Sequence, residues 1–267
     1  MLQSRNSRYL TATIVLGGIL ASFWGSRKGG SNQNNRTVKK RQNKLDRNLL
    51  TPANATFGIA WGVIYSGTAA LIFHQASSRQ LSNPRYARAQ NWLRANYILG
   101  ALFGYFFSRS DRTGRVGAAL TTMSMLPAAL GLHRALAIGQ FTPPQPERTL
   151  QKSVSLYTGW LGAASAISLI NLLQEAGYFT KKKAAVRISQ YAIPTLATGA
   201  IAASRSLRDP YLLIPIAGAL LGIAAKQQHS NKSVAQLSLT IAGTILADLL
   251  NNLGTNGKVI PVKAPST

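Results

Sequence analysis

Long apolar runs alternate with short clusters of basic residues along the whole chain. The apolar runs are roughly 15–22 residues long and carry almost no charge, which suits helices that cross a bilayer. A soluble protein of this size would interleave charged residues along its helix faces instead. The pattern therefore predicts an all-α fold, a polytopic membrane helix bundle with about eight transmembrane helices. The expected spans are 9–24, 53–74, 92–108, 116–136, 153–174, 188–204, 211–225 and 233–250.

The composition of these spans changes after about residue 180. The last three spans are short, rich in alanine and glycine, and lack the aromatic pattern of the first five. Within them Gly218 and Gly222 lie one helical turn apart, which predicts a face where another helix packs closely. We expect a five-helix membrane unit with a basic loop at 25–50, then a three-helix membrane extension, then a C-terminal tail. These parts cover residues 1–180, 181–252 and 253–267.

The N-terminal segment allows two interpretations. Met1–Arg8 is basic and Tyr9–Trp24 is apolar, which is the layout of a signal peptide and also of a first membrane span. No small-x-small cleavage site follows, because the apolar run ends in bulky Phe23 and Trp24. The sequence therefore favours a retained first span.

The charge balance is strongly basic, with 30 Lys and Arg against 6 Asp and Glu and a net charge of +24. Such a balance usually indicates nucleic acid binding. Here the basic residues flank apolar runs, so we expect a bilayer with anionic lipids, or an acidic partner in the membrane, and no nucleic acid. The chain has no cysteine, which excludes disulfides and cysteine-ligated metal sites.

The distribution of basic residues also predicts an orientation. The loops after the first, third, fifth and seventh spans hold seventeen of the thirty Lys and Arg residues. The positive-inside rule then places loop 25–50 on the cytoplasmic (or stromal) side and both termini opposite. We expect this loop to be flexible alone and to contact an anionic surface, although its bases could serve topology only. The expected contact residues are Arg36, Lys39, Lys40, Arg41, Lys44 and Arg47.

The stretch Thr51–Gln75 has the most distinctive pattern in the chain. Thr51 or Asn54 is expected to cap a helix here. Phe57, Trp61 and Tyr65 then recur every four residues, so they form one aromatic ridge. Gly58, Gly62 and Ser66 lie beside that ridge and leave room for another backbone or for a flat ligand.

The pattern Pro-x4-Phe-x3-Trp-x3-Tyr resembles the TspO/MBR family, the tryptophan-rich sensory proteins related to the mitochondrial translocator protein. Asn96 begins a stretch similar to the family's Asn-x-x-Trp-x-x-Leu-Phe, with Leu99 in place of the tryptophan. Tyr157 and Trp160 resemble its Tyr-x-x-Trp-x3-Ala-x3-Asn, with Ser168 in place of the asparagine. The resemblance covers about residues 10–175, and long members of the family carry three extra C-terminal helices.

The resemblance implies a five-helix bundle with a pocket for flat hydrophobic ligands, covered by the first loop. Porphyrin, haem or a chlorophyll-type tetrapyrrole would be the ligand, and the protein would act as a sensor, carrier or scavenger. Aromatic faces would stack on the ligand, and polar groups would orient it in an apolar site. The expected ligand-binding residues are Phe57, Trp61, Tyr65, Asn96, Tyr157 and Trp160.

A metal site has only weak support in the sequence. His74 and His133 end two spans that run in the same direction, so both lie at the side opposite the basic loop. Two imidazoles at one level could ligate the metal of a haem or chlorophyll, but interfacial histidines bonded to headgroups explain them more simply. Asp248, inside the last span, is a functional candidate by position. A structural ion pair, for which Arg94 and Arg134 lie at the same side, or simple exposure near the interface explains it more simply.

The sequence supports two functional classes best, and offers a third, a transporter, only Asp248 and the proline-containing helices. The six acidic residues lie mostly in loops, and the sequence contains no nucleophile elbow or phosphate loop, so no catalytic residue and no enzyme activity is expected. The first class is the tetrapyrrole-binding membrane protein. The alternative is a non-catalytic structural accessory subunit of a photosynthetic or respiratory membrane complex. The partner is then a larger assembly, whereas the first class is compatible with a homodimer.

Overall fold

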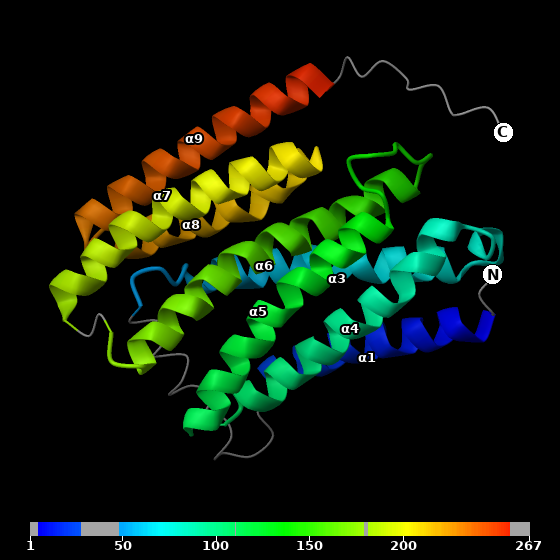
Figure 1. Ribbon diagram of the computed structural model, residues 1–267, viewed down its shortest axis with the longest axis horizontal. Coiled ribbons are helices and arrows are strands. Elements are labelled where there is room, and N and C mark those ends of the chain that lie inside the picture. The colour runs from blue at the N-terminus through cyan, green and yellow to red at the C-terminus, as the bar shows by residue number, and fades with distance from the viewer. Residues whose placement is uncertain (1–4, 28–47, 110, 179–180, 257–267) are drawn as a thin grey trace.

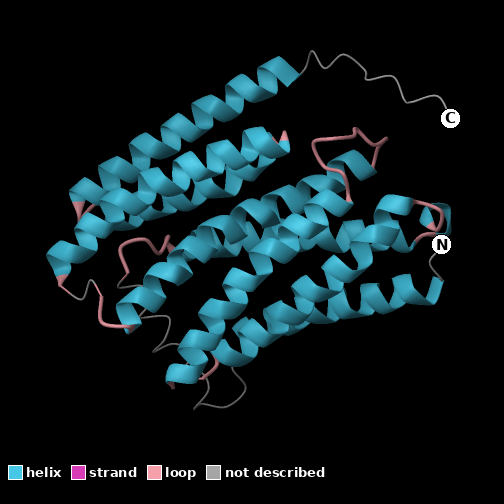
Figure 2. Ribbon diagram, viewed as in Figure 1, coloured by secondary structure: helices cyan, strands magenta, loops and turns pink. Residues whose placement is uncertain are grey.

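The computed structural model describes residues 5–27, 48–109, 111–178 and 181–256. These residues form eight α-helices and two short 3₁₀ turns without a strand (Figures 1 and 2), so the all-α prediction is confirmed. Each predicted span overlaps one helix, and four of the spans extend one or two residues beyond it. The helices are α1 (Arg5–Arg27), α3 (Asn54–Ala76), α4 (Pro84–Phe107), α5 (Arg112–Ala135), α6 (Glu147–Glu175), α7 (Lys182–Leu207), α8 (Leu213–Gln227) and α9 (Lys232–Asn256), with η1 (Ser78–Gln80) and η2 (Pro210–Leu212) between them.

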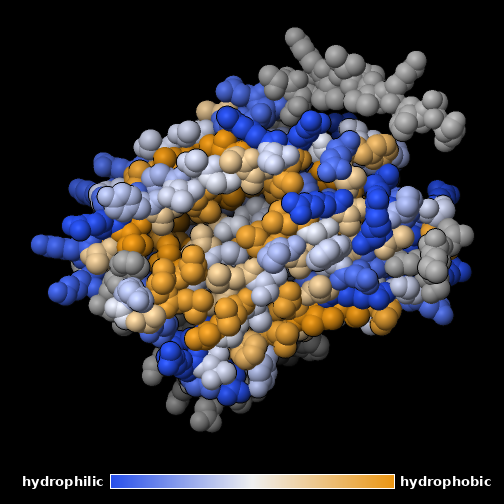
Figure 3. Space-filling view, viewed as in Figure 1, coloured by the Kyte–Doolittle hydropathy of each residue, from blue (hydrophilic) through white to orange (hydrophobic). Residues whose placement is uncertain are grey.

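Among the described residues, five helical segments are long and apolar enough to cross a membrane: α3, α5, α6, α8 together with η2, and α9. Large apolar side chains on the outside of the bundle support this, since Ile59, Tyr191 and Leu250 are each about two-thirds exposed or more. In Figure 3 hydrophobic residues form patches across the middle and lower part of the visible face, and hydrophilic ones gather toward its left and right ends. That outer surface is suited to lipid. A membrane crossing by α1, α4 and α7 remains a prediction.

Five of the helices pack in a closed ring. Going round it, α1 contacts α3, α3 contacts α6, α6 contacts α5, α5 contacts α4, and α4 returns to α1. The remaining three form a group beside the ring, seen at the upper left of Figure 1. In this group α8 packs against α3 and α6, and α9 packs against α7 and α8. The ring encloses an interior that side chains of α3 and α6 reach.

The apolar core does not stop at the edge of the ring. One cluster of buried residues joins α3, α5 and α6 to α7, α8 and α9, with Trp160, Ile193 and Leu220 among its members. A second cluster joins α1, α3, α4, α5 and α6. Tyr65 packs against both clusters. The helix group of α7–α9 is therefore held to the ring by continuous apolar packing, which stabilises it in proportion to the area buried.

The start of α3 differs from the prediction. The residue before the helix is Ala53, and no side chain caps the helix, so the expected cap from Thr51 or Asn54 was wrong. A tertiary contact takes the place of a cap, because the Ala53 N–H donates to the Gly222 carbonyl at 3.2 Å. A Cβ on Gly222 would clash with Thr56. The predicted close-packing face is thus present at Gly222, whereas a Cβ on Gly218 would meet nothing within 4 Å.

The start of α5 is set by a side chain. Asp111 accepts a hydrogen bond from the Gly114 N–H at 2.8 Å, which satisfies one of the free donors of the first turn. The Arg109 guanidinium also donates to this carboxylate, and these hydrogen bonds hold the pKa of Asp111 below its ordinary value. The short connection between α4 and α5 is therefore fixed by local polar contacts.

Candidate functional site

Six aromatic side chains meet inside the ring, and we call them the aromatic cluster. Trp61 lies at its centre, with ring centroids 4.9 Å from Tyr65 and 6.2 Å from both Tyr157 and Trp160. Phe57 meets Trp160 edge-on at 5.4 Å. On the other side Tyr97 stacks against Tyr157 at 6.5 Å. The cluster consists of Phe57, Trp61 and Tyr65 from α3, Tyr97 from α4, and Tyr157 and Trp160 from α6.

Helical spacing explains why these side chains converge. The four-residue repeat puts the α3 aromatics on one face, and Tyr157 and Trp160 are three residues apart on α6. Since α3 packs against α6 in the ring, the two faces meet. Tyr157 and Trp160 are buried, with 6% and 3% of their surface exposed, whereas the α3 side chains are half-buried. The accessible edge of the aromatic cluster therefore lies on α3.

Asn96, the amide residue expected in this site, makes its hydrogen bond within its own helix. Asn96 is buried, and its side chain donates to the Trp92 carbonyl of its own helix at 2.8 Å. Its Oδ1 atom has no hydrogen-bond partner within the described part of the chain. The neighbouring Tyr97 is the α4 residue that reaches the aromatic cluster. Sequence reasoning missed Tyr97, although it stands inside the same Asn96–Phe103 stretch.

The rings of the aromatic cluster contact one another. A cavity of about 530 Å³ lies elsewhere, between α4 and α5. A second cavity, of about 20 Å³, lies among α6, α7 and α8. Gly58 and Gly62 are exposed on α3, and a Cβ on either would meet nothing within 4 Å. The room that these glycines provide is therefore on the outer side of α3, next to the accessible edge of the cluster.

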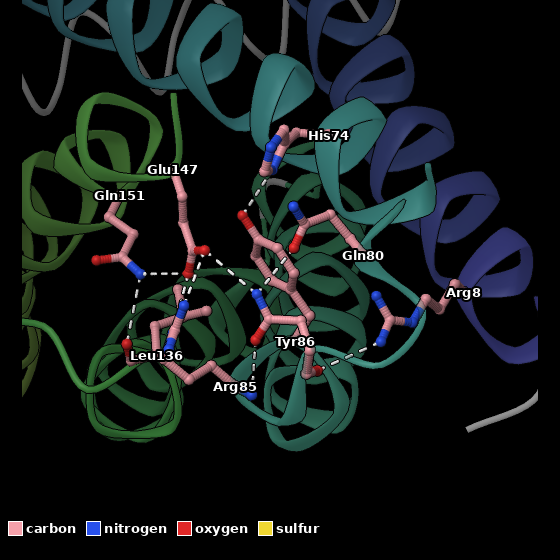
Figure 4. A network of polar contacts seen from close by, with 9 residues as sticks. Arg8, His74, Gln80, Arg85, Tyr86, Leu136, Glu147 and Gln151 are labelled. Carbon is pink, nitrogen blue, oxygen red and sulfur yellow. Dashed lines mark hydrogen bonds and ion pairs between the residues drawn. The ribbon is translucent and has the colours of Figure 1, made fainter. Parts of the chain in front are cut away.

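A buried carboxylate organises the end of the ring at which α1 begins (Figure 4). Glu147, the first residue of α6, has only 3% of its surface exposed. Arg85 donates to both of its oxygens, at 3.0 and 2.9 Å. Asn83 and Gln151 donate to the same carboxylate at 3.2 and 3.0 Å. Four hydrogen bonds from α4, its preceding turn and α6 compensate the cost of burying this charge.

A second buried charge ties α1 to the same end of the ring. Arg8 is fully buried and donates to the backbone carbonyls of Gln75 at 2.8 Å and Leu81 at 2.9 Å. It also reaches the Asn83 carbonyl at 3.4 Å. These carbonyls belong to the end of α3 and the turn before α4, so the guanidinium satisfies acceptors that a helix end leaves free.

The two histidines have separate partners. His74 Nδ1 lies 2.9 Å from the Tyr86 hydroxyl. His133 is buried and its Nε2 lies 2.8 Å from Asp209 Oδ2, which joins the end of α5 to the turn before η2. No group of three or more His, Asp or Glu side chains that could hold a metal occurs among the residues described. The structure thus gives these histidines polar partners within the protein.

A match to a family model decides the relationship that the motifs suggested. Residues 10–250 match the model described as TSPO-like protein. The chain belongs to the TSPO-like family. The TspO/MBR resemblance predicted from the motifs is therefore confirmed, and with five apolar helices this TSPO-like chain is a multi-pass integral membrane protein. The match includes α7, α8 and most of α9, whereas the motifs reached only about residue 175. No curated protein and no solved structure matches the chain significantly.

The acid inside the last helix of this TSPO-like protein has a different partner from the two that the sequence suggested. Asp248 pairs with Arg205 of α7 at 2.6 Å, not with Arg94 or Arg134. Arg94 instead donates to Ser7 and Thr11 of α1. The reason is the packing order, because α9 lies against α7 and α8, away from α4 and α5.

The six basic residues predicted to contact an anionic surface, Arg36 to Arg47, lie outside the described residues of the TSPO-like chain. The end of their loop is anchored at Asn48, whose side chain donates to Asn171 of α6 at 2.6 Å. Gln227 of α8 donates to the Leu49 carbonyl at 3.2 Å. The side of the membrane on which this loop lies, and its contact with anionic lipid, remain predictions.

Proposed function

We propose that this TSPO-like protein binds a flat apolar ligand of the tetrapyrrole class at the aromatic cluster and acts as a sensor, carrier or scavenger. The observation that supports this is the convergence of six aromatic rings from three helices inside the five-helix ring. Aromatic faces in an apolar surrounding favour a flat, polarisable ligand by stacking. The tetrapyrrole itself is an expectation from the family resemblance, and the rings alone would accept other flat lipophiles.

Binding at this cluster requires rings to separate. Each ring–ring contact contributes about 0.5–1.5 kcal/mol beyond its buried area, so a ligand must replace these contacts with larger ones of its own. The half-buried side chains Phe57, Trp61 and Tyr65 are the ones free to move, since their edge faces outward. Gly58 and Gly62 leave open space beside them. We infer that the ligand enters from the lipid side of α3 and stacks between Trp61 and Trp160.

The role that we propose is binding without catalysis. Each of the five carboxylates among the described residues has a cationic or imidazole partner within 3 Å: Asp111 with Arg109, Glu147 with Arg85, Glu175 with Arg115, Asp209 with His133, and Asp248 with Arg205. None of these pairs lies in the aromatic cluster. General acid–base chemistry there would have tyrosine hydroxyls as its only groups, and we propose none.

Replacing both Trp61 and Trp160 by alanine is expected to weaken porphyrin binding at least tenfold, because the two indole faces would be lost. The measurement is an absorbance titration of protoporphyrin IX with the full chain in detergent, which does not depend on tryptophan emission. Phe73→Ala is the matched control, since Phe73 is an aromatic residue of the same helix that is 66% exposed. Its binding curve should equal that of the wild type.

The double variant also creates a cavity, so its melting temperature is measured alongside. Trp160→Phe keeps an aromatic face with less loss of volume, and should weaken binding by less than the double variant. Unchanged or tighter porphyrin binding in a folded double variant would mean that stacking on these rings does not hold the ligand, and the proposal would be abandoned.

The close packing of the rings on one another favours a second candidate, a structural accessory subunit of a larger membrane complex. In that case the aromatic cluster is core packing, and the exposed apolar faces of α3 and α7 meet neighbouring subunits. Native gels of membranes solubilised in mild detergent separate the two candidates. Migration as a monomer or dimer supports the ligand-binding role, and comigration with a large complex supports the structural one.

A further inference from the structure

A groove on the outside of the ring, between α4 and α5, is independent of the aromatic cluster. It has a volume of about 530 Å³ and is open to the exterior. Its lining contains two arginines, one tryptophan and three small or cyclic residues. These are Arg88 and Trp92 from α4, and Pro127, Gly131, Arg134 and Ala135 from α5.

The lining residues are ordered by depth. Arg134 is the penultimate residue of α5, and Arg88 is in the second turn of α4. Because the two helices are antiparallel, both arginines lie at the same end of the helix pair. Trp92 is one turn further in, against Gly131, where a Cβ would come within 2.5–2.7 Å of the indole ring. Pro127 is about 10 Å deeper than Arg134 along the helix axis. The groove therefore has a cationic mouth, an aromatic wall and an apolar inner end.

The two arginines at the mouth are not neutralised within the described part of the chain. Both are exposed, and neither guanidinium group forms a hydrogen bond or ion pair with those residues. The five carboxylates of the same residues are all paired with other side chains. Arg85, which is one turn before Arg88, is occupied by Glu147. The groove thus presents two guanidinium charges and no opposing acid.

We propose that this groove binds an anionic phospholipid, with the headgroup phosphate between Arg88 and Arg134 and an acyl chain along Trp92, Gly131 and Pro127. Guanidinium groups bind phosphate oxygens in a bidentate manner. Tryptophan is the side chain that membrane proteins place at the level of the headgroups. Since α5 is one of the five candidate spans, the mouth of the groove lies where a headgroup would be.

The test compares lipids and variants by native mass spectrometry of the full chain in detergent. Phosphatidylglycerol should bind at least about tenfold more tightly than phosphatidylcholine, and Arg88→Gln with Arg134→Gln should remove that preference. The matched control is Arg79→Gln with Arg148→Gln, which removes the same charge from two exposed arginines at the same end of the molecule. This control should keep the preference for phosphatidylglycerol.

A second measurement does not depend on the arginine variants. Brominated phosphatidylglycerol should quench tryptophan emission more than brominated phosphatidylcholine, and Trp92→Phe should remove this difference. Equal binding of the two lipids, or equal loss in the control variant, would overturn the proposal. Stabilisation by inorganic phosphate as strong as that by phosphatidylglycerol would also overturn it, because the ligand would then be a free anion. None of these outcomes depends on whether porphyrin binds the aromatic cluster.

Discussion

Glu147→Ala is expected to lower the free energy of unfolding by about 3–5 kcal/mol, because it leaves a largely buried guanidinium without its counter-charge. The side chain of Arg85 is only 18% exposed, so water cannot replace the carboxylate. The same change removes the acceptor for Asn83 and Gln151, whose donors would remain in the interior. Unsatisfied buried donors add to the cost.

The measurement is the melting temperature of the protein in detergent, which should fall by about 6 °C or more. Asp248→Ala is the control, because its partner Arg205 is 66% exposed and stays hydrated when the acid is removed. That control should cost under about 1 kcal/mol. Glu147→Gln should fall between the two, since the amide keeps an acceptor but loses the charge. If Glu147→Ala melts within a degree of Asp248→Ala, the buried network does not hold this end of the ring together.

Gly159→Ala is expected to separate α6 from η2 and to destabilise the protein by about 1–3 kcal/mol or more. A Cβ on Gly159 would clash with the Leu212 carbonyl and approach a Pro215 ring carbon at 2.8 Å. The first of these is backbone, so it cannot move away as a flexible side chain would. Alanine normally stabilises a helix relative to glycine by up to about 1 kcal/mol. A loss of stability in this variant would therefore come from the clash and not from helix propensity.

Gly162→Ala is the matched control on the same helix, because a Cβ there would meet nothing within 4 Å. It should be neutral or slightly stabilising. The expected difference is seen in the melting temperatures of the two variants and in the rate of proteolysis between α6 and α8. Equal stability of the two variants would contradict the close packing of α8 and its preceding turn on α6.

The helices could be predicted from the sequence because their apolar runs are long and their boundaries are charged. The order in which the helices pack around the ring could not be predicted, since it depends on contacts between residues far apart in the chain. The start of α6 illustrates the limit. The apolar run begins only at Ser153, so the predicted span began there. The helix itself begins at Glu147, more than one turn before the apolar run.

The aromatic cluster was predictable in part. A four-residue repeat is enough to place Phe57, Trp61 and Tyr65 on one face, but the α6 residues came from the family resemblance. On α4 adjacent positions differ by about 100° around the helix axis, and the sequence does not say which of Asn96 and Tyr97 contacts the other rings. Tyr97 stacks against Tyr157, whereas the Asn96 side chain donates to a carbonyl of its own helix.

The buried charges were missed for a related reason. From the sequence alone, a single acidic residue or arginine near a loop is interpreted as an exposed residue at the membrane interface. Glu147 and Arg85 are 62 residues apart, and Arg8 lies 67 residues from Gln75. Only the packing of α1, α4 and α6 at one end of the ring brings these groups together, and no local pattern marks them.

The most direct test of the proposed function is a structure of the full chain in a bilayer mimetic with protoporphyrin IX bound. We expect the macrocycle inside the ring between α3 and α6, with the Trp61 and Trp160 rings moved apart from their present centroid distance of 6.2 Å to face it. A macrocycle found only outside the ring, for example in the groove between α4 and α5, with the aromatic cluster still packed on itself, would contradict this expectation.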